Sequence, residues 1–230
     1  MPYTYIANNL ARVRENMEKA ALRAGRPPCD LIAVTKSATD DEVRALFSLG
    51  VDKFGENRAE LFNRRAYISA EFKHDVEAHF IGTLQRNKVK AIADNVSLIH
   101  SLDSLPLARE IEKQAAKRDV CIPVLLEINS GREENKSGLM PEDVYALADE
   151  VRLLPHVRLF GIMTMAPNCE SREDYRKFFR ETRKAFDRLA SENAFDTDAP
   201  VLSMGMSQSY EIAIEEGATV VRVGTTLFQK

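Results

Sequence analysis

The sequence alternates between short apolar segments and amphipathic segments, and this alternation limits what the chain can fold into. Eight segments carry a strand signal, and a helix signal separates each from the next. The expected strands cover residues 31–36, 51–54, 79–81, 96–101, 123–128, 157–165, 201–204 and 219–223. Because each crossover helix returns the chain to the same end of the sheet, strands in this pattern run parallel.

Eight such repeats predict an α/β fold in which the strands close into a (β/α)8 (TIM) barrel. Barrels of about this length commonly form one domain, so we expect a single domain over residues 1–230. Apolar residues at helical spacing predict an extra lead-in helix within residues 1–25. The alternative is an open doubly wound sheet, but the glycine-rich nucleotide-binding motif of such sheets does not follow the first strand.

Composition and charge exclude several classes of protein. Of the residues, 44% are hydrophobic and 29% charged, as in ordinary globular proteins, and the net charge of −3 argues against a nucleic-acid or anionic-membrane binder. The sequence has no apolar run of transmembrane length and no secretory signal at its start. Its three cysteines form no CxxC pair, and its four histidines lack metal-ligand spacing. We therefore expect a cytoplasmic protein without a metal site.

A lysine stands at the end of the first expected strand, where a buried strand has no structural use for a cation. In such a barrel the chemistry gathers at the carboxyl ends of the strands. Because side chains alternate along a strand, Lys36 points the same way as Ile32 and Val34. If that side is the core, Lys36 is partly desolvated and can act as an amine nucleophile towards carbonyls. The alternative is a lysine that extends to water.

Two small-residue loops follow the seventh and eighth strands, where barrels frequently bind phosphate. Gly205-Met206-Ser207 follows the seventh strand and Gly224-Thr225 the eighth. Glycine lets the backbone approach a ligand, and a hydroxyl group is available in each loop. The alternative role of Ser207 is to cap the helix that follows.

Arg222 places a permanent positive charge near the end of the last strand. It shares its side of the strand with Val220. One interpretation is a structural ion pair with Glu56 or another carboxylate of the rim. The other is a cation directed at the ring or acid group of a ligand.

Together these residues resemble the pyridoxal 5′-phosphate homeostasis protein family (the YggS/PROSC type), which is related to the barrel domain of alanine racemase. The matching segments are Ala33–Lys36, Phe54–Asn57, His79–Gly82, Leu84–Gln85, Asn87–Lys88, His100–Asp103, Asn135–Gly138, Ser203–Ser207 and Val221–Thr225. The ordered set spans most of the chain. The resemblance implies the fold type III barrel that binds pyridoxal 5′-phosphate (PLP).

The resemblance also implies roles for individual residues. Lys36 would hold PLP covalently as a Schiff base, and Arg222 would face the pyridine nitrogen, where a cation weakens the electron sink used in carbanion chemistry. Ser207 and the backbone at Met206, Gly224 and Thr225 would hold the phosphate. The remaining cofactor-binding residues are Asn57 and Ser203.

Two functions remain at this point. The first is a non-enzymatic protein of vitamin B6 homeostasis that stores, buffers or delivers PLP, with PLP-dependent apoenzymes as candidate recipients. The second is a PLP-dependent amino-acid racemase or decarboxylase. Enzymes of the related fold carry a second β-rich domain, whereas this sequence ends a few residues after the last strand signal. We therefore expect the carrier, as a monomer, with a weak dimer left open.

Overall fold

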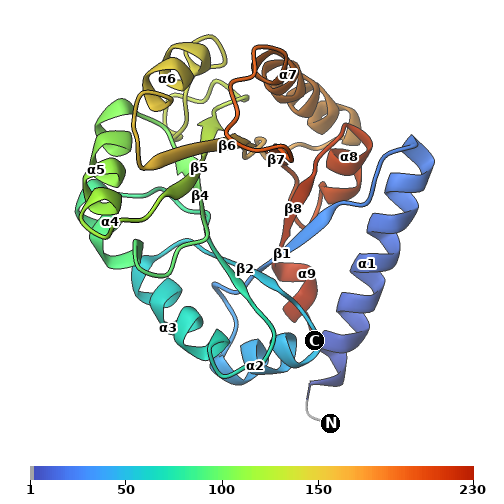
Figure 1. Cartoon of the computed structure of the whole chain (residues 1–230). Coiled ribbons are helices and arrows are strands. Elements are labelled where there is room, and N and C mark those ends of the chain that lie inside the picture. The colour runs from blue at the N-terminus through green and yellow to red at the C-terminus, as the bar shows by residue number, and fades with distance from the viewer. Residues whose placement is uncertain (1–2) are drawn as a thin grey trace.

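The computed structural model describes residues 3–230, and in it eight parallel strands form a closed barrel (Figure 1). The strands are β1 (Asp30–Val34), β2 (Lys53–Glu56), β3 (Glu77–Phe80), β4 (Leu98–Leu102), β5 (Ile122–Ile128), β6 (Val157–Thr164), β7 (Val201–Ser203) and β8 (Val220–Val223). Each strand pairs with the next, and β8 pairs with β1. The predicted barrel is confirmed, and the open sheet is excluded.

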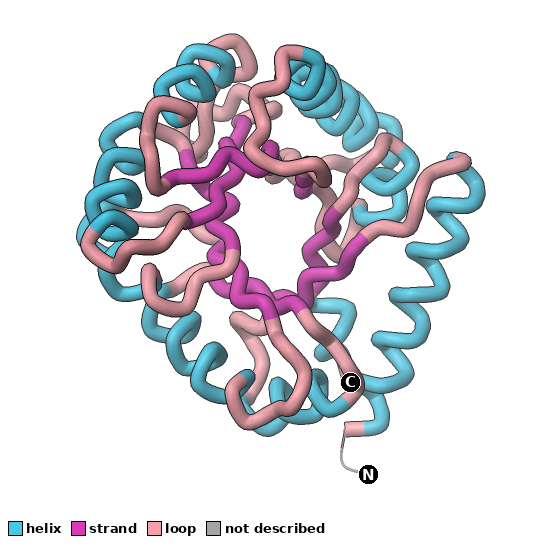
Figure 2. Tube along the Cα trace, in the orientation of Figure 1, coloured by secondary structure: helices cyan, strands magenta, loops and turns pink. Residues whose placement is uncertain are grey.

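Helices surround the barrel, as the outer ring in Figure 2 shows. They are α2 (Asp40–Ser48), α3 (Ala59–Ser69), α4 (Arg86–Ile92), α5 (Leu105–Ala116), α6 (Val144–Val151), α7 (Arg172–Ser191), α8 (Tyr210–Glu215) and α9 (Thr225–Phe228). The main core lies between the outward strand residues and these helices. In the described part of the chain, no helix is long and apolar enough to cross a membrane.

The lead-in helix is observed as α1 (Thr4–Ala24), while residues 1–2 of the expected range lie outside the described residues. Its apolar face, which includes Ile6 and Val13, is buried, and the helix packs against α8 and α9. Asn9 Nδ2 donates hydrogen bonds to the carbonyl oxygens of Leu227 and Gln229, at 3.3 and 2.8 Å. These contacts tie the start of the chain to its end.

Two β-bulges change the direction in which side chains point. On β6, Leu159 pairs with Val124 but Gly161 pairs with Leu125, so Phe160 is an extra residue. Glycine is required at 161, because a Cβ atom there would lie 1.9 Å from the backbone oxygen of Val201. A similar irregularity on β4 lies between residues 99 and 102. The bulges shift the inward and outward positions of both strands partway along their length.

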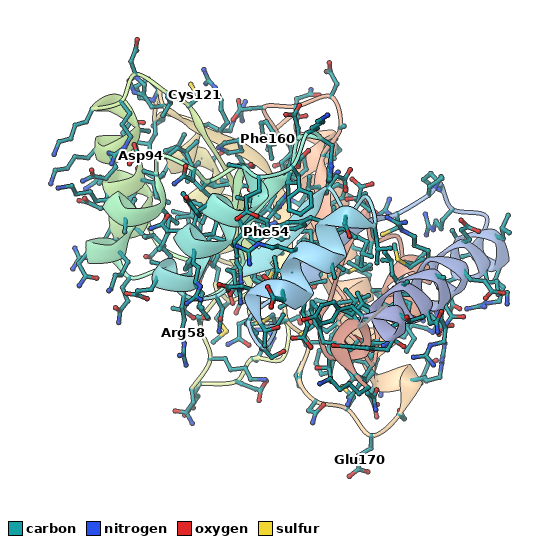
Figure 3. All side chains as sticks on the ribbon, turned by 90° about the horizontal axis from the view of Figure 1, so that it is seen from below. Phe54, Arg58, Asp94, Cys121, Phe160 and Glu170 are labelled. Atoms are coloured by element: carbon teal, nitrogen blue, oxygen red, sulfur yellow. The ribbon has the colours of Figure 1, made fainter. Side chains whose placement is uncertain are left out.

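The two rims of the barrel are chemically distinct because all strands run in one direction. In the side view of Figure 3, Arg58, which follows β2, and Glu170, which follows β6, lie at one end. Asp94 and Cys121, which precede β4 and β5, lie at the other. All loops that follow strands therefore meet at one rim, the carboxyl rim.

Candidate functional site

The predicted site residues come together because β7, β8, β1 and β2 are consecutive in the barrel (Figure 1). Lys36 follows β1 and Asn57 follows β2, while Ser207 and Thr225 follow β7 and β8. The pairing of β1 with β8 sets Ile32 opposite Arg222. Four adjacent strand ends thus bring an amine, a cation and two small-residue loops onto one arc of the carboxyl rim.

The loops after β7 and β8 contact each other directly. The Gly224 N–H donates to Ser207 Oγ at 3.4 Å, and the Arg222 N–H donates to the Gly205 oxygen at 3.1 Å. Gly205 has φ +92°, and a Cβ atom there would lie 2.5 Å from the Cβ of Ala213. A Cβ at Gly224 would lie 3.0 Å from the backbone oxygen of Val34. Glycine at both positions lets the loops close against their neighbours.

The capping role considered for Ser207 is wrong. Helix α8 begins at Tyr210 and is preceded by Ser209, whose hydroxyl accepts the Met206 N–H at 3.2 Å. The Met206 amide is therefore already bonded within its loop. Met206 and Thr225 are exposed, and Ser207 and Gly224 are half-buried, so a ligand can reach this part of the rim.

The expectation that Lys36 is partly desolvated is wrong for this structure. Strand β1 ends at Val34, and Lys36 is exposed in the turn that follows. The turn is closed by the Ala38 N–H, which donates to the Thr35 oxygen at 2.9 Å. The amine therefore projects from a short ordered turn, as the alternative interpretation expected.

A largely buried cluster of polar and charged residues holds that turn from outside the barrel. Thr35 Oγ1 donates to Glu56 Oε1 at 2.6 Å, and Arg65 Nε lies 3.6 Å from the same oxygen. Arg65 also donates to the Ala38 oxygen at 2.5 Å and forms an ion pair with Asp40. Burial raises the pKa of Glu56, although Thr35 and Arg65 oppose the shift. We call Thr35, Asp40, Glu56 and Arg65 the turn clamp.

The turn clamp also corrects an expectation about Arg222. Glu56 points outward to Arg65 on α3, whereas Arg222 points into the barrel, so these two residues do not form the ion pair that was considered. Among residues 3–230, Arg222 has no carboxylate partner within 4.0 Å.

Arg222 is 3% exposed and is held by two acceptors. Its Nη1 donates to Ser203 Oγ at 2.6 Å, and its Nη2 donates to the Thr164 oxygen at 2.9 Å. Burial lowers the pKa of Arg222 to about 10, while the charge of Glu127 acts in the opposite direction. The guanidinium therefore remains a cation at neutral pH.

Glu127 is a further buried ionisable group, which the sequence did not single out. Ser137 Oγ donates to its Oε1 at 3.0 Å, while its buried Oε2 has no hydrogen-bond partner. Burial raises the pKa of Glu127, Asp103 raises it further, and Arg222 opposes the shift. Its signal in the sequence was a carboxylate inside an apolar strand segment.

His79 and His100 lie inside the barrel behind Ser203, and both are buried. The sequence placed them in segments shared with the family but assigned no role to them. In the sequence, as for Glu127, the available signal was an ionisable residue within an apolar strand segment. Among the described residues, no group of His, Cys, Asp or Glu has the arrangement of a metal site.

Comparisons with known proteins match most of the chain. The profile described as "Alanine racemase, N-terminal domain" matches residues 8–230. A pyridoxal phosphate homeostasis protein from Aquifex aeolicus (strain VF5) is 43% identical over 221 residues, which cover 95% of each chain.

Solved structures show the same architecture. PipY from Synechococcus elongatus PCC7942, 29% identical, superimposes with a TM-score of 0.86 without PLP and 0.81 with PLP bound. Both comparisons cover 97% of this chain and 99% of PipY. Alanine racemase from Corynebacterium glutamicum, 18% identical, has a TM-score of 0.73, and the match covers 98% of this chain but 61% of the racemase. That likeness concerns the fold alone.

The turn clamp generates a stability prediction. Replacing Arg65 (Arg65→Met) leaves Glu56 buried without its cation, so we expect the free energy of unfolding to fall by about 3–5 kcal/mol. Arg64→Met is the matched control, because Arg64 contacts the same Asp40 from the surface and should matter much less. Urea denaturation measures both, and equal losses would contradict a buried clamp.

Glu127 generates a pH prediction. Its folded pKa lies above the ordinary value of 4.5, so protonation favours the folded state. This stabilisation is complete below the unfolded pKa and is lost as pH rises through the folded pKa. Glu127→Gln mimics the protonated acid, so the stability of this variant relative to the unsubstituted protein should rise as the pH increases from 4.5 through the folded pKa of Glu127.

The matched control for this pH series has the opposite sign. Arg132 lowers the pKa of Glu142, so Glu142→Gln should lose relative stability as pH rises. Chemical denaturation at several pH values measures both variants. A difference for Glu127→Gln that does not change with pH would show that the carboxyl is not perturbed by burial.

Proposed function

Because this chain belongs to the pyridoxal phosphate homeostasis protein family, we propose that it binds PLP at the carboxyl rim and stores, buffers or delivers it in vitamin B6 homeostasis. The observation that carries the proposal is the convergence of Lys36 with the two joined glycine loops on adjacent strands. The PLP-bound structure of PipY, which shares this fold, supports it.

The loops after β7 and β8 fit a phosphate group. Glycine at 205 and 224 lets the two loops pack closely, because Cβ atoms there would clash with or crowd neighbouring residues. Ser207 and Thr225 add hydroxyl groups, and phosphate oxygens are strong acceptors. We propose Ser207 and the backbone of Met206, Gly224 and Thr225 as the phosphate-binding set, with Ser203 and Asn57 nearer the ring. In this proposal the N–H groups of Met206 and Gly224 exchange their present acceptors, Ser209 Oγ and Ser207 Oγ, for phosphate oxygens.

Lys36 is the proposed covalent anchor. Its amine would form a Schiff base with the PLP aldehyde and release water. The turn clamp fixes the position of the turn, while the side chain itself is exposed. An exposed linkage suits a carrier, because free amines or a recipient apoenzyme can reach it.

Arg222 is the proposed partner of the pyridine nitrogen. Its pKa of about 10 keeps it positively charged at neutral pH. A cation at that position disfavours protonation of the ring nitrogen, and an unprotonated ring withdraws electrons less strongly. This favours holding PLP over carbanion chemistry, although it does not prevent Schiff-base exchange.

The alternative is a racemase or decarboxylase of the same barrel type. The match to the Corynebacterium glutamicum racemase leaves 39% of that chain without a counterpart among the described residues, since it covers 61%. The Aquifex aeolicus homeostasis protein, by contrast, is matched over 95% of its length. We therefore propose a non-enzymatic, cytoplasmic protein that works as one barrel domain over residues 1–230, as a monomer, with PLP-dependent apoenzymes as candidate recipients.

The covalent anchor can be tested by absorption and mass spectrometry. Protein incubated with PLP should turn yellow, and borohydride should bleach it by reducing the Schiff base to a stable adduct on Lys36. Lys36→Ala should lose the visible band, whereas Lys88→Ala, which removes a surface lysine paired with Glu60, should retain it. A protein that takes up no PLP would refute the proposal, and an unchanged band in Lys36→Ala would move the anchor elsewhere.

The carrier function can be tested against the enzymatic alternative. Incubation of the PLP-loaded protein with alanine, serine, ornithine or lysine should yield no racemised or decarboxylated product beyond that of free PLP. Chiral chromatography and amine analysis measure both products. Sustained turnover of any of these amino acids would contradict the carrier and support the enzyme.

A further inference from the structure

A continuous line of hydrogen bonds runs inside the barrel from Arg222 to the opposite rim. Ser203 Oγ, which accepts from Arg222, lies 3.0 Å from His100 Nδ1. His100 Nε2 lies 2.9 Å from His79 Nδ1, and His79 Nε2 lies 3.2 Å from Glu77 Oε2. We call Ser203, His100, His79 and Glu77 the interior relay.

The interior relay crosses the barrel rather than following its wall. Ser203 is on β7 and His100 is on β4, and these strands are not neighbours. His79, on β3, continues the line to Glu77 at the start of the same strand. Ser203 and His100 are fully buried, whereas the Glu77 side chain is 52% exposed. The line is therefore closed to water in the middle and opens only at the rim opposite Lys36.

The chemistry at the two ends of the interior relay fixes the direction of its outer hydrogen bonds. Arginine only donates, so Ser203 Oγ accepts from Arg222, and an ionised carboxylate only accepts, so His79 Nε2–H donates to Glu77. Burial, the largest cause, lowers the pKa of His100, which keeps it neutral with a single ring proton. If His79 also carries one ring proton, its bond to Glu77 places that proton on Nε2, so His100 Nε2–H donates to His79 and the Ser203 hydroxyl donates to His100.

This arrangement stabilises the Arg222 cation, which has no counter-ion within 4.0 Å among the described residues. A hydroxyl that donates its own proton becomes a better acceptor, and hydrogen bonds in a chain strengthen one another. The relay thus makes Ser203 a stronger acceptor for Arg222, while the Thr164 oxygen holds the second nitrogen at 2.9 Å. Two fixed acceptors determine the orientation of the planar guanidinium.

We propose that Ser203, His100 and His79 are positioning residues that hold Arg222 towards the ring of bound PLP. Through their hydrogen bonds, the negative charge of Glu77 at the opposite rim polarises Ser203, the acceptor of Arg222. This inference rests on the proposed function and deepens it, because it makes the electronic state of the ring depend on His100, His79 and Glu77, which lie behind Ser203 and away from the proposed ligand site. If the relay residues had a purely structural role, the direction of their hydrogen bonds would not affect the electronic state of the ring.

The first test uses the protein without PLP. Nitrogen-15 NMR of histidine-labelled protein distinguishes the two neutral tautomers, and His100→Gln and His79→Gln assign the signals. Both His79 and His100 should carry the proton on Nε2. A proton on Nδ1 of His100 would overturn the proposal, whatever the protein binds.

The second test uses the PLP-bound protein and asks whether the relay acts through Arg222. His100→Phe removes both hydrogen bonds, and it should shift the absorption maximum of bound PLP in the same direction as Arg222→Leu. The double variant should match Arg222→Leu alone. A shift from His100→Phe that is equally large in the Arg222→Leu background would overturn the proposal.

A third test addresses the charge of Glu77 with a matched pair of variants. Glu77 and Asp30 both approach Lys53, at 3.8 and 3.5 Å, but only Glu77 belongs to the relay. Glu77→Gln should shift the absorption maximum part of the way, and Asp30→Asn should leave it unchanged. Equal shifts would show a general charge effect and refute the relay.

The experiments distinguish a failure of the relay from a failure of the proposed function. If the unsubstituted protein forms no PLP absorption band, the proposed function fails, and the tautomer measurement still decides the relay. If His100→Phe does not fold, the rim variants Glu77→Gln and Asp30→Asn carry the spectroscopic test.

Discussion

The pairing of β1 with β8 closes the barrel, and the whole site depends on it. Residues 30–33 pair in register with residues 220–223. This contact joins the first strand to the last and places the Lys36 turn beside the loops that follow β7 and β8. Gly224 packs closely against Val34, because a Cβ atom at this position would lie 3.0 Å from the backbone oxygen of Val34. Without this closure, the amine and the proposed phosphate loops would stand at opposite edges of an open sheet.

Closure also creates an interior in which charges must be compensated. Arg222 points inward and is met by a hydroxyl and a carbonyl, whereas Glu56 points outward and is met by Arg65. In each arrangement, groups from other strands or helices hold the buried ion, although Glu56 Oε2 and Arg65 Nε make no hydrogen bond. Inside the barrel, the compensation extends through two imidazoles to the opposite rim. Because these groups are buried and hydrogen-bonded to one another, the protonation state of one group affects its neighbours.

Family membership and geometry support different parts of the functional account. The relationship to pyridoxal phosphate homeostasis proteins points to the ligand, because a family member with this fold has been solved with PLP bound. The geometry supplies the local reasons: an exposed amine on a clamped turn, two loops that need glycine, and a cation held in one orientation. These features suit a protein that holds a reactive aldehyde and releases it to other amines.

By itself, the sequence determined the alternation of strands and helices, the lead-in helix and the positions of the small-residue loops. These depend on local periodicity and on glycine, which act over a few neighbouring residues. It did not determine that Lys36 is exposed, that Ser207 is free of a capping role, or that Glu56 and Arg222 point to opposite sides of the barrel wall. Nor did it reveal roles for His79, His100 and Glu127. Those outcomes depend on strand length, bulges and contacts between residues more than 20 positions apart, such as His100 and Ser203 across the barrel. Only the closed barrel brings such residues together, because hydrogen bonds and burial act through space and leave little trace in local sequence.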